Sequence, residues 1–333
     1  MAETQDPSFI QRKRLVRVDY ESDPSFGVAP LQRDLNSMLE MGVVVLDKPA
    51  GPTSHQVAAW TRDLLGIERA GHGGTLDPGV TGVLPVTLGR ATKAVGALLY
   101  ASKEYICYMK LHRDVREEKV RAVLSEFEDE IFQVPPVRSA VKRQQRSRRI
   151  YSLKVLELDG RDVLFRVSCQ AGTYIRTLCQ DVGEVLGVGA HMQELRRVRT
   201  ARFTEDTAVT LHDLKDAFVF WKEGSEKELR RILLPMESLL QHLPAVVVRD
   251  GAVDALCHGA RLAVPGIVAL DSGIQKGDKV VVLTAKGEGI ALGRAEMTSE
   301  AMLELNQGIA VTTERVFMPP GTYPKGWRSS GAA

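Results

Sequence analysis

Cysteine, aromatic residues and long apolar runs are all scarce in this sequence. Four cysteines are spread over 333 residues without a Cys-x-x-Cys pair, so we expect neither a zinc site nor a disulfide framework. No apolar run approaches the roughly 20 residues that a membrane-spanning helix needs, and the N-terminus lacks a signal-peptide pattern. We therefore expect a cytoplasmic protein that binds no metal and no membrane.

The net charge is also small, at +2 with histidine neutral, but it is unevenly distributed. Residues 1–40 and residues 244–320 each carry two more acidic than basic side chains, and residues 321–333 carry two more basic ones, which leaves +4 for residues 41–243. A basic block of this kind is typical of a protein that holds a phosphate backbone. We therefore expect any nucleic-acid contact chiefly in the middle of the chain.

The length predicts about two domains. Residues 1–40 show no sustained periodicity and are expected to form an N-terminal extension packed on another part of the protein. Residues 41–243 form the larger predicted domain, and Leu243-Pro244 is its expected boundary. In residues 244–320, short β-rich pieces are separated by glycines, which predicts a small barrel, and residues 321–333 form a tail.

Several elements of the larger domain can be predicted from periodicity. Ser54 is expected to cap a helix that ends at Gly66 and buries Val57, Trp60 and Leu64. Helices are also predicted from Arg90 to Leu99 and over residues 117–128, and a strand over 103–111. A further helix is expected to begin after a Thr173 cap, bury Ile175, Leu178, Val182 and Val185, and end at Gly187.

One stretch of the larger domain frames a single carboxylate with glycines and prolines. Residues 71–85 read GHGGTLDPGVTGVLP, so Asp77 is followed directly by Pro78. Glycine permits sharp turns and close approach of a ligand, and proline fixes the backbone, so the carboxylate would stand on a stiff loop. For an isolated Asp-Pro-Gly, a surface turn with a capping Asp is the favoured interpretation, since turn chemistry alone explains such residues.

Other strings share this domain with Asp77. Residues 47–55 read DKPAGPTSH, residues 103–105 read KEY, residues 172–178 read GTYIRTL, and residues 189–199 read GAHMQELRRVR. Six basic residues and no acidic one lie between Arg138 and Arg149. Such a run is often a solvated loop, but its lack of an apolar face also suits a mobile arm that contacts phosphates.

Taken in order, these strings resemble the motifs of the TruB-type pseudouridine synthases, whose GHxGTLDPxxTGVLP pattern runs through residues 71–85. The resemblance covers roughly residues 41–320. It implies an α+β protein: a catalytic domain built on a mixed, largely antiparallel sheet with flanking helices, followed by a small β-barrel PUA domain. The N-terminal extension would then pack on the PUA domain.

The resemblance also implies roles for individual residues. Asp77 would be the catalytic carboxylate, and Arg176 would pair with it and keep it ionised and oriented. Tyr105 would stack on the target base, and Leu195 would lie under that base. Two further residues would position the substrate: His72, by holding the flipped nucleotide, and Lys48, by supporting the catalytic loop.

RNA contacts are expected at three places. The family's thumb loop falls on the basic run, which gives the predicted contacts Arg138, Lys142, Arg143, Arg146, Arg148 and Arg149. Arg196 and Arg197 are expected to meet phosphates in the string that carries Leu195. In the PUA domain, the predicted contacts are Gly259 and Ala260.

The implied reaction breaks the N1–C1′ bond of a uridine, turns the base, and rejoins it through C5. No redox step or group transfer occurs, so no cofactor is expected. The nucleotide must be extruded from the RNA stack to reach the carboxylate. Asp77 would either attack C1′ or take the C2′ proton, and the sequence leaves both open.

Three features favour the dyskerin-like branch of the family: the N-terminal extension, the full PUA domain with its tail, and the strings HRDV at 112–115 and GAHM at 189–192. Members of that branch act on rRNA with a box H/ACA guide RNA. They assemble with small proteins of the Nop, Gar and kink-turn-binding types. Eukaryotic dyskerins carry long lysine-rich tails, whereas this sequence ends at Ala333, so an archaeal type is expected.

Two alternatives remain at this stage. A stand-alone enzyme would modify uridine 55 of tRNA without any guide. An RNA-binding assembly scaffold would not need catalysis, although Asp77, Tyr105 and Arg176 all match the catalytic pattern.

Overall fold

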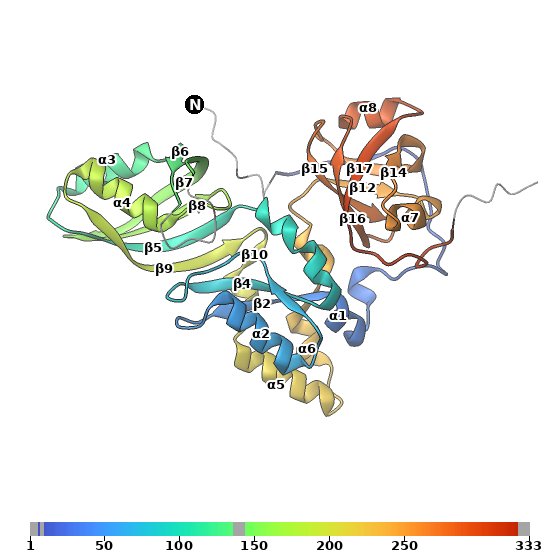
Figure 1. The fold of residues 1–333 in the computed structure, drawn as a ribbon, viewed down its shortest axis with the longest axis horizontal. Helices are drawn as coiled ribbons and strands as arrows, with labels where there is room; N and C mark the ends of the chain where they lie inside the picture. The colour runs from blue at the N-terminus through green and yellow to red at the C-terminus, as the bar shows by residue number, and fades with distance from the viewer. Residues whose placement is uncertain (1–5, 7–9, 136–143, 326–333) are drawn as a thin grey trace, which may run out of the picture.

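The computed structural model describes residue 6 and residues 10–135 and 144–325. Two parts are visible, a large domain with a long curved sheet and a smaller β-rich domain joined to it near the centre of the molecule (Figure 1). The large domain has a ten-stranded sheet with strand order β11-β2-β4-β9-β5-β8-β7-β6, and β3 and β10 pair with β4 and β9. Its strands are β2 (Gly42–Lys48), β3 (Ala70–His72), β4 (Thr81–Leu88), β5 (Lys103–Leu111), β6 (Asp129–Gln133), β7 (Arg146–Asp159), β8 (Asp162–Cys169), β9 (Ala190–Thr200), β10 (Phe203–Thr204) and β11 (Leu233–Pro235).

Most neighbours in this sheet are antiparallel, but β4 and β9 run parallel, with Gly82 opposite Arg197. Gly82 has a φ of 103°, and a Cβ built on it would lie 2.2 Å from the carbonyl oxygen of Arg197. Only glycine fits this approach without displacing a strand. The mixed, largely antiparallel sheet with flanking helices confirms the predicted fold class.

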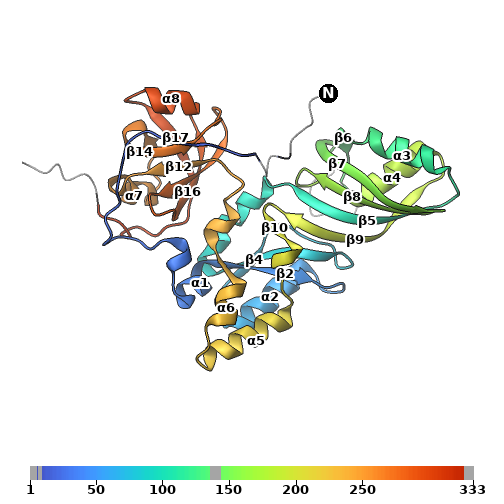
Figure 2. The same cartoon turned by 180° about the vertical axis from the view of Figure 1, so that it is seen from behind.

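Helices cover the two ends of the sheet separately (Figures 1 and 2). At one end, α3 and α4 cover β5, β7, β8 and β9, and at the other end α2, α5 and α6 lie against β2 and β4. Each end has its own apolar core. The helices of this domain are α1 (Leu35–Met41), α2 (Ser54–Leu65), α3 (Glu117–Glu126), α4 (Ile175–Leu186), α5 (Leu211–Lys222) and α6 (Lys227–Ile232).

Several local predictions need correction. Thr53, rather than Ser54, caps α2 through a capping box with Gln56, although Gly66 ends the helix as expected. Trp60 is 48% exposed, because Ala58 and Thr61 fill the buried face instead. Residues 89–99 form a 3-10 helix, η3 (Gly89–Leu99).

Helix α4 shows the same kind of difference. Its cap is Tyr174, one residue later than predicted, and Gly187 ends it in a left-handed conformation as expected. Val185 is 55% exposed, while Leu186 takes the expected place in the core. Periodicity located α2 and α4, but it assigned part of the buried face of each helix to a side chain next to the one that is covered.

The smaller domain has a seven-stranded sheet with strand order β1-β14-β12-β15-β16-β17-β13. Its first strand comes from the N-terminal extension, with Leu15 of β1 opposite Leu270 of β14. The extension therefore forms part of this sheet. The elements are β1 (Arg14–Val16), β12 (Ala245–Val248), β13 (Leu262–Ala263), β14 (Ile267–Asp271), β15 (Lys279–Thr284), β16 (Gly289–Ala295), β17 (Ile309–Val316), α7 (Asp250–Cys257) and α8 (Ser299–Glu304).

The domains share an apolar core. Phe317, Val281 and Leu292 from the smaller domain join residues of β2, η3 and the short helix η5 (Met236–Leu239) in one buried cluster. The tail also packs back, since Tyr323 is 2% exposed and its hydroxyl donates to Glu288. Among the residues described, no helix is long and apolar enough to cross a membrane.

Candidate active site

Asp77 lies in the loop between β3 and β4, and hydrogen bonds from a buried lysine hold this loop in place. Lys48, at the end of β2, is fully buried and its Nζ donates to the carbonyl oxygens of Pro49 at 2.8 Å, Pro78 at 3.1 Å and Val80 at 2.8 Å. Burial lowers the Lys48 pKa, and the nearby Asp77 carboxylate acts in the opposite direction. Two of the three acceptors, the carbonyls of Pro78 and Val80, belong to the loop that carries Asp77.

Ser54, at the start of α2, also forms hydrogen bonds to this loop. Its hydroxyl accepts a hydrogen bond from the Leu76 N–H at 2.8 Å and donates to the Leu76 carbonyl at 3.1 Å. Both Ser54 and Leu76 are buried. Ser54 was predicted only to cap α2, because the hydroxyl of a residue at a helix start is most simply assigned to the helix itself.

Arg176 and Asp77 form an ion pair across the loop. Arg176 Nη2 lies 3.0 Å from Asp77 Oδ2, and the two side chains are 38% and 49% exposed. Arg176 is in the first turn of α4, which β8 delivers to the site. The pair leaves part of the carboxylate open to solvent, so a ligand can still reach it.

Tyr105 lies on β5 with a side chain that is only 9% exposed. Cys107 and Met109 share its face, as the strand alternation predicts. Its partner across the strand pair β5–β9 is Arg197. Burial is the main cause of a raised Tyr105 pKa, and Arg197 opposes it.

His72 ends β3 beside the catalytic loop, and its ring meets the ring of His55 edge to face with centroids 4.6 Å apart. Burial first, and then the charges of His55 and Arg197, lowers the His72 pKa to about 4. The imidazole is therefore neutral near pH 7. This agrees with holding a nucleotide and not with donating a proton. The part played by His55 was missed, because nothing in the sequence links the first turn of α2 to β3.

The residues predicted to contact RNA differ in how far they are exposed to solvent. Leu195 is half-buried on β9, and Arg196 beside it pairs with Asp47 at 2.9 Å and with Glu205. The prediction that Arg197 meets phosphates is wrong for this structure, because its side chain is 1% exposed and donates to backbone carbonyls. Gly259 and Ala260 are exposed after α7, in the smaller domain.

The predicted mobile basic arm is partly a strand. Arg146, Arg148 and Arg149 belong to β7, which pairs with β6, and Arg149 forms an ion pair with Asp129 at 2.9 Å. Pairing with β6 satisfies this backbone, so these three residues do not form a loose loop. Arg138, Lys142 and Arg143 lie outside the described residues.

Asp77 and Arg176 are paired, and Tyr105 lies on β5, which β9 separates from β4. The large domain is that of an RNA pseudouridine synthase. Residues 62–175 match the N-terminal domain of the TruB family of pseudouridylate synthases, and residues 176–241 match the C-terminal domain of tRNA pseudouridylate synthase B. Residues 244–317 match the PUA domain, and residues 10–58 match the DKCLD domain. The chain belongs to the TruB family and is an isomerase that acts on RNA.

Curated relatives match along nearly the whole chain. A protein of Methanopyrus kandleri named probable tRNA pseudouridine synthase B is 57% identical over 317 residues, which cover 95% of this chain and 94% of that protein. A protein of the same name from Pyrococcus abyssi is 55% identical over 324 residues, which cover 96% of this chain and 97% of that protein.

Solved structures extend the likeness to assembled particles. A crystal structure of a Cbf5-Nop10-Gar1 complex contains a chain 53% identical, with a TM-score of 0.93, covering 98% of this chain and all of that one. A structure of an H/ACA RNP bound to a substrate RNA containing 2′-deoxyuridine contains a chain 52% identical, with a TM-score of 0.90, covering 96% of this chain and 99% of that one. These likenesses confirm the predicted family and its dyskerin-like branch.

Proposed function

We propose that this chain converts uridine to pseudouridine in rRNA under the direction of a box H/ACA guide RNA, as the catalytic subunit of a ribonucleoprotein. The observation that carries the proposal is the full-length likeness to a chain in an H/ACA RNP bound to substrate RNA. Proteins of the Nop, Gar and kink-turn-binding types would be its partners, and the first two types accompany the similar chain of the Cbf5-Nop10-Gar1 complex. A cytoplasmic location in an archaeal cell is part of the proposal.

In the reaction we infer, Asp77 acts on the sugar of a flipped uridine, either by attacking C1′ or by taking the C2′ proton. The Arg176 guanidinium, 3.0 Å away, keeps the carboxylate ionised and fixes its direction. Tyr105 and Leu195 would hold the base, and neutral His72 would hold the nucleotide without exchanging protons. Lys48 and Ser54 keep the loop in one shape, so the carboxylate needs little reorganisation when RNA binds.

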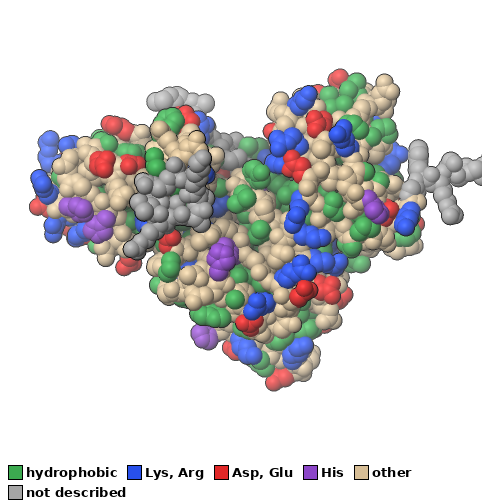
Figure 3. Space-filling view, viewed as in Figure 1, with side chains coloured by type: hydrophobic (Ala, Val, Ile, Leu, Met, Phe, Trp, Pro, Cys, Tyr) green, Lys and Arg blue, Asp and Glu red, His purple; other side chains and the backbone are tan. Residues whose placement is uncertain are grey.

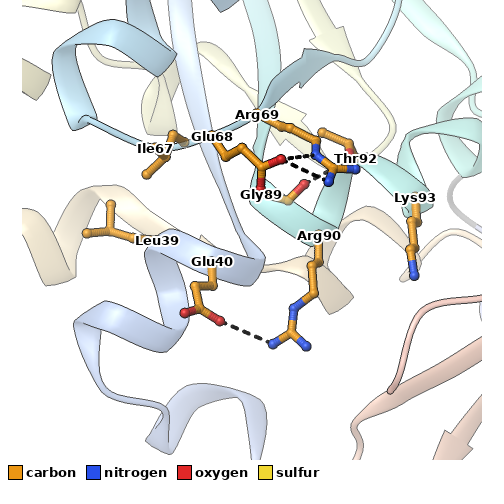
Figure 4. A pocket seen from close by; sticks show the side chains of 9 residues that line it. All are labelled: Leu39, Glu40, Ile67, Glu68, Arg69, Gly89, Arg90, Thr92 and Lys93. Atoms are coloured by element: carbon orange, nitrogen blue, oxygen red, sulfur yellow. Dashed lines mark hydrogen bonds and ion pairs between the residues drawn. The ribbon is translucent and has the colours of Figure 1, made fainter. Parts of the chain in front are cut away.

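A basic surface at the junction of the two domains supports the binding of a guide RNA. Lys and Arg side chains gather on the face over this junction (Figure 3). A cleft in the large domain is lined by Arg69, Arg90 and Lys93, together with the carboxylates of Glu40 and Glu68. Arg69 pairs with Glu68 at 3.1 Å and Arg90 with Glu40 at 3.3 Å, whereas Lys93 points away from both pairs (Figure 4). We infer that these three residues contact phosphates of the guide.

A stand-alone tRNA enzyme is the second candidate. The names of the curated relatives, probable tRNA pseudouridine synthase B, favour it. It requires activity on tRNA without a guide, which separates it from the first candidate.

Release of tritium from [5-³H]uridine in RNA tests both candidates. Purified protein is given either unmodified tRNA alone, or a guide with its rRNA target and the small partner proteins. Release that requires the guide supports the ribonucleoprotein, and efficient release from tRNA alone supports the stand-alone enzyme. No release from either RNA favours the scaffold.

The role of Asp77 is tested by Asp77→Asn, which should abolish release while keeping RNA affinity within about a few-fold. Asp63→Asn, on exposed α2, is the matched control and should keep the rate. A normal rate in Asp77→Asn would remove Asp77 from its role.

The basic surface is tested by Lys93→Glu, which should weaken guide binding and reduce the salt slope by about 1. Lys215→Glu, on the exposed face of α5, is its control. Equal salt slopes for the two variants would remove Lys93 from the RNA surface.

A further inference from the structure

Arg197 is a buried cation at the centre of the active site, and the proposed function gives it no task. Its side chain is 1% exposed. Nε donates to the Val83 carbonyl at 2.7 Å, and Nη2 donates to the Gly74 carbonyl at 3.2 Å. It forms no ion pair with a carboxylate anywhere in residues 10–135 and 144–325. A guanidinium buried without an acidic partner is costly, so its contacts need an explanation.

The contacts of Arg197 join three parts of the site. Val83 belongs to β4, Gly74 belongs to the loop that carries Asp77, and Tyr105 lies directly opposite Arg197 on β5. The guanidinium therefore ties β4 to the catalytic loop, and it does so on the strand position that faces Tyr105. Few side chains other than arginine can do this, because the donors must point to separate acceptors at once.

The surroundings of Tyr105 are poor in negative charge. Arg197 on β9, Cys169 on β8 and Asp77 in the loop are the charged or titratable groups that act on Tyr105. Lys103, two residues earlier on β5, is also buried, donates to the carbonyls of Leu98 and Ala101, and has a pKa lowered to about 7 by burial and by Arg197. Negative charge on the Tyr105 oxygen would thus meet the charge of Arg197 on the neighbouring strand.

We propose that Arg197 is a positioning residue for the last chemical step, in which it holds the Tyr105 oxygen and balances its negative charge while that oxygen takes the C5 proton. This rests on the proposed function. Once C5 has joined C1′, C5 still carries its hydrogen and N1 is doubly bonded to C6. The phenolate of Tyr105 takes the proton and becomes a phenol. The electron pair of the C5–H bond forms the C5–C6 double bond, and the N1–C6 π pair moves to N1, which takes a proton from solvent.

The pKa shift of Tyr105 agrees with this geometry. Burial raises the pKa, and the charge of Arg197 opposes this rise, so Arg197 reduces the cost of the phenolate. Removing the guanidinium should raise the Tyr105 pKa further. Proton removal from C5 should then become slower and should require a higher pH.

The test uses the complete chain on whichever RNA the wild type modifies, with single-turnover kinetics on uridine or [5-²H]uridine. Arg197→Met should slow product formation by on the order of tenfold to hundredfold, below the ~10²–10⁴ expected for loss of a general base. It should enlarge the C5 isotope effect and shift the pH–rate profile to higher pH. Arg197→Lys, which keeps the charge, should restore part of each change.

A second measurement does not depend on turnover. The ¹³Cζ resonance of Tyr105, assigned by its loss in Tyr105→Phe, should titrate at higher pH in Arg197→Met than in the wild type. Arg33→Met removes another buried arginine, whose side chain is 10% exposed and paired with Glu237, far from the site. This control should lower stability without changing the isotope effect or the Tyr105 titration.

The outcomes separate this proposal from the proposed function. If Arg197→Met slows the reaction while the isotope effect, the pH profile and the Tyr105 titration stay as in the wild type, Arg197 is only structural and the proposal is overturned. If Arg197→Met does not fold, an Arg197→Lys variant with an unchanged Tyr105 titration and full C5 proton loss at wild-type pH overturns it equally. A wild type that releases no tritium while the Tyr105 titration still shifts would count against the proposed function alone.

Discussion

Replacing Lys48 by methionine should loosen the catalytic loop while lowering the stability of the protein only slightly. Methionine has nearly the same length and fills the same buried space without the ammonium group. The change removes the hydrogen bonds from Nζ to the carbonyls of Pro49, Pro78 and Val80. Two of these carbonyls, those of Pro78 and Val80, lie one and three residues after Asp77 in the loop, so the loss falls on the site.

The magnitude follows from two opposing terms. Each hydrogen bond from a charged donor contributes about 1.5–3 kcal/mol, and three are lost. Removing a buried ammonium returns several kcal/mol of desolvation cost, which offsets most of this. We expect the free energy of unfolding to fall by about 1–2 kcal/mol. The carbonyls left without a donor then draw water, the loop loosens, and a displacement of about 1 Å lowers the rate about 10²-fold.

Guanidinium unfolding and single-turnover tritium release measure the two effects. Lys110→Met, on the same sheet but with its Nζ paired to Asp162 at 2.6 Å, is the control and should keep the rate within about threefold. A Lys48→Met variant with a wild-type rate would show that the loop holds its shape without the lysine. It would refute the assignment of Lys48 as the support of the loop.

Three further predictions concern other contacts. Arg176→Lys keeps the charge but changes the reach to Asp77, so the single-turnover rate should fall about 10- to 100-fold, and an unchanged rate would contradict the role of the pair. Ser54→Ala leaves the Leu76 N–H and carbonyl buried without their partner, so denaturant melts should show a loss of about 1–3 kcal/mol, and an unchanged midpoint would exclude this fastening. His242 is buried and neutral, with a pKa lowered from 6.5 to about 4 chiefly by burial. The stability that neutral His242 contributes is complete above pH 6.5 and is lost as the pH falls toward about 4. Over this range, the free energy of unfolding should fall by up to about 3 kcal/mol less in His242→Gln than in the wild type, as melts at each pH can measure. An equal pH dependence in both proteins would contradict this prediction.

Much of the fold could be predicted because its determinants are local in sequence. The strand β5 was predicted with Tyr105, Cys107 and Met109 on one buried face, since alternation fixes which side chains share a side. Gly66 and Gly187 end their helices in the left-handed conformation that glycine tolerates best. Trp60 and Val185 were misplaced because both lie at the edge of an apolar stripe, where the neighbouring element decides which residue is covered.

Asp77, Tyr105 and Arg176 could be predicted as site residues without a structure, since they stand in strings specific enough to name the family. The groups around them come from distant parts of the chain and depend on the folded protein. The Val80 carbonyl lies 32 residues from Lys48 in sequence, and Val83 lies 114 residues from Arg197, so no local pattern could link them. The sequence shows that Arg196 and Arg197 are adjacent arginines. The sheet turns one toward Asp47 and Glu205 and buries the other beneath the catalytic loop, because successive side chains on a strand point to opposite faces.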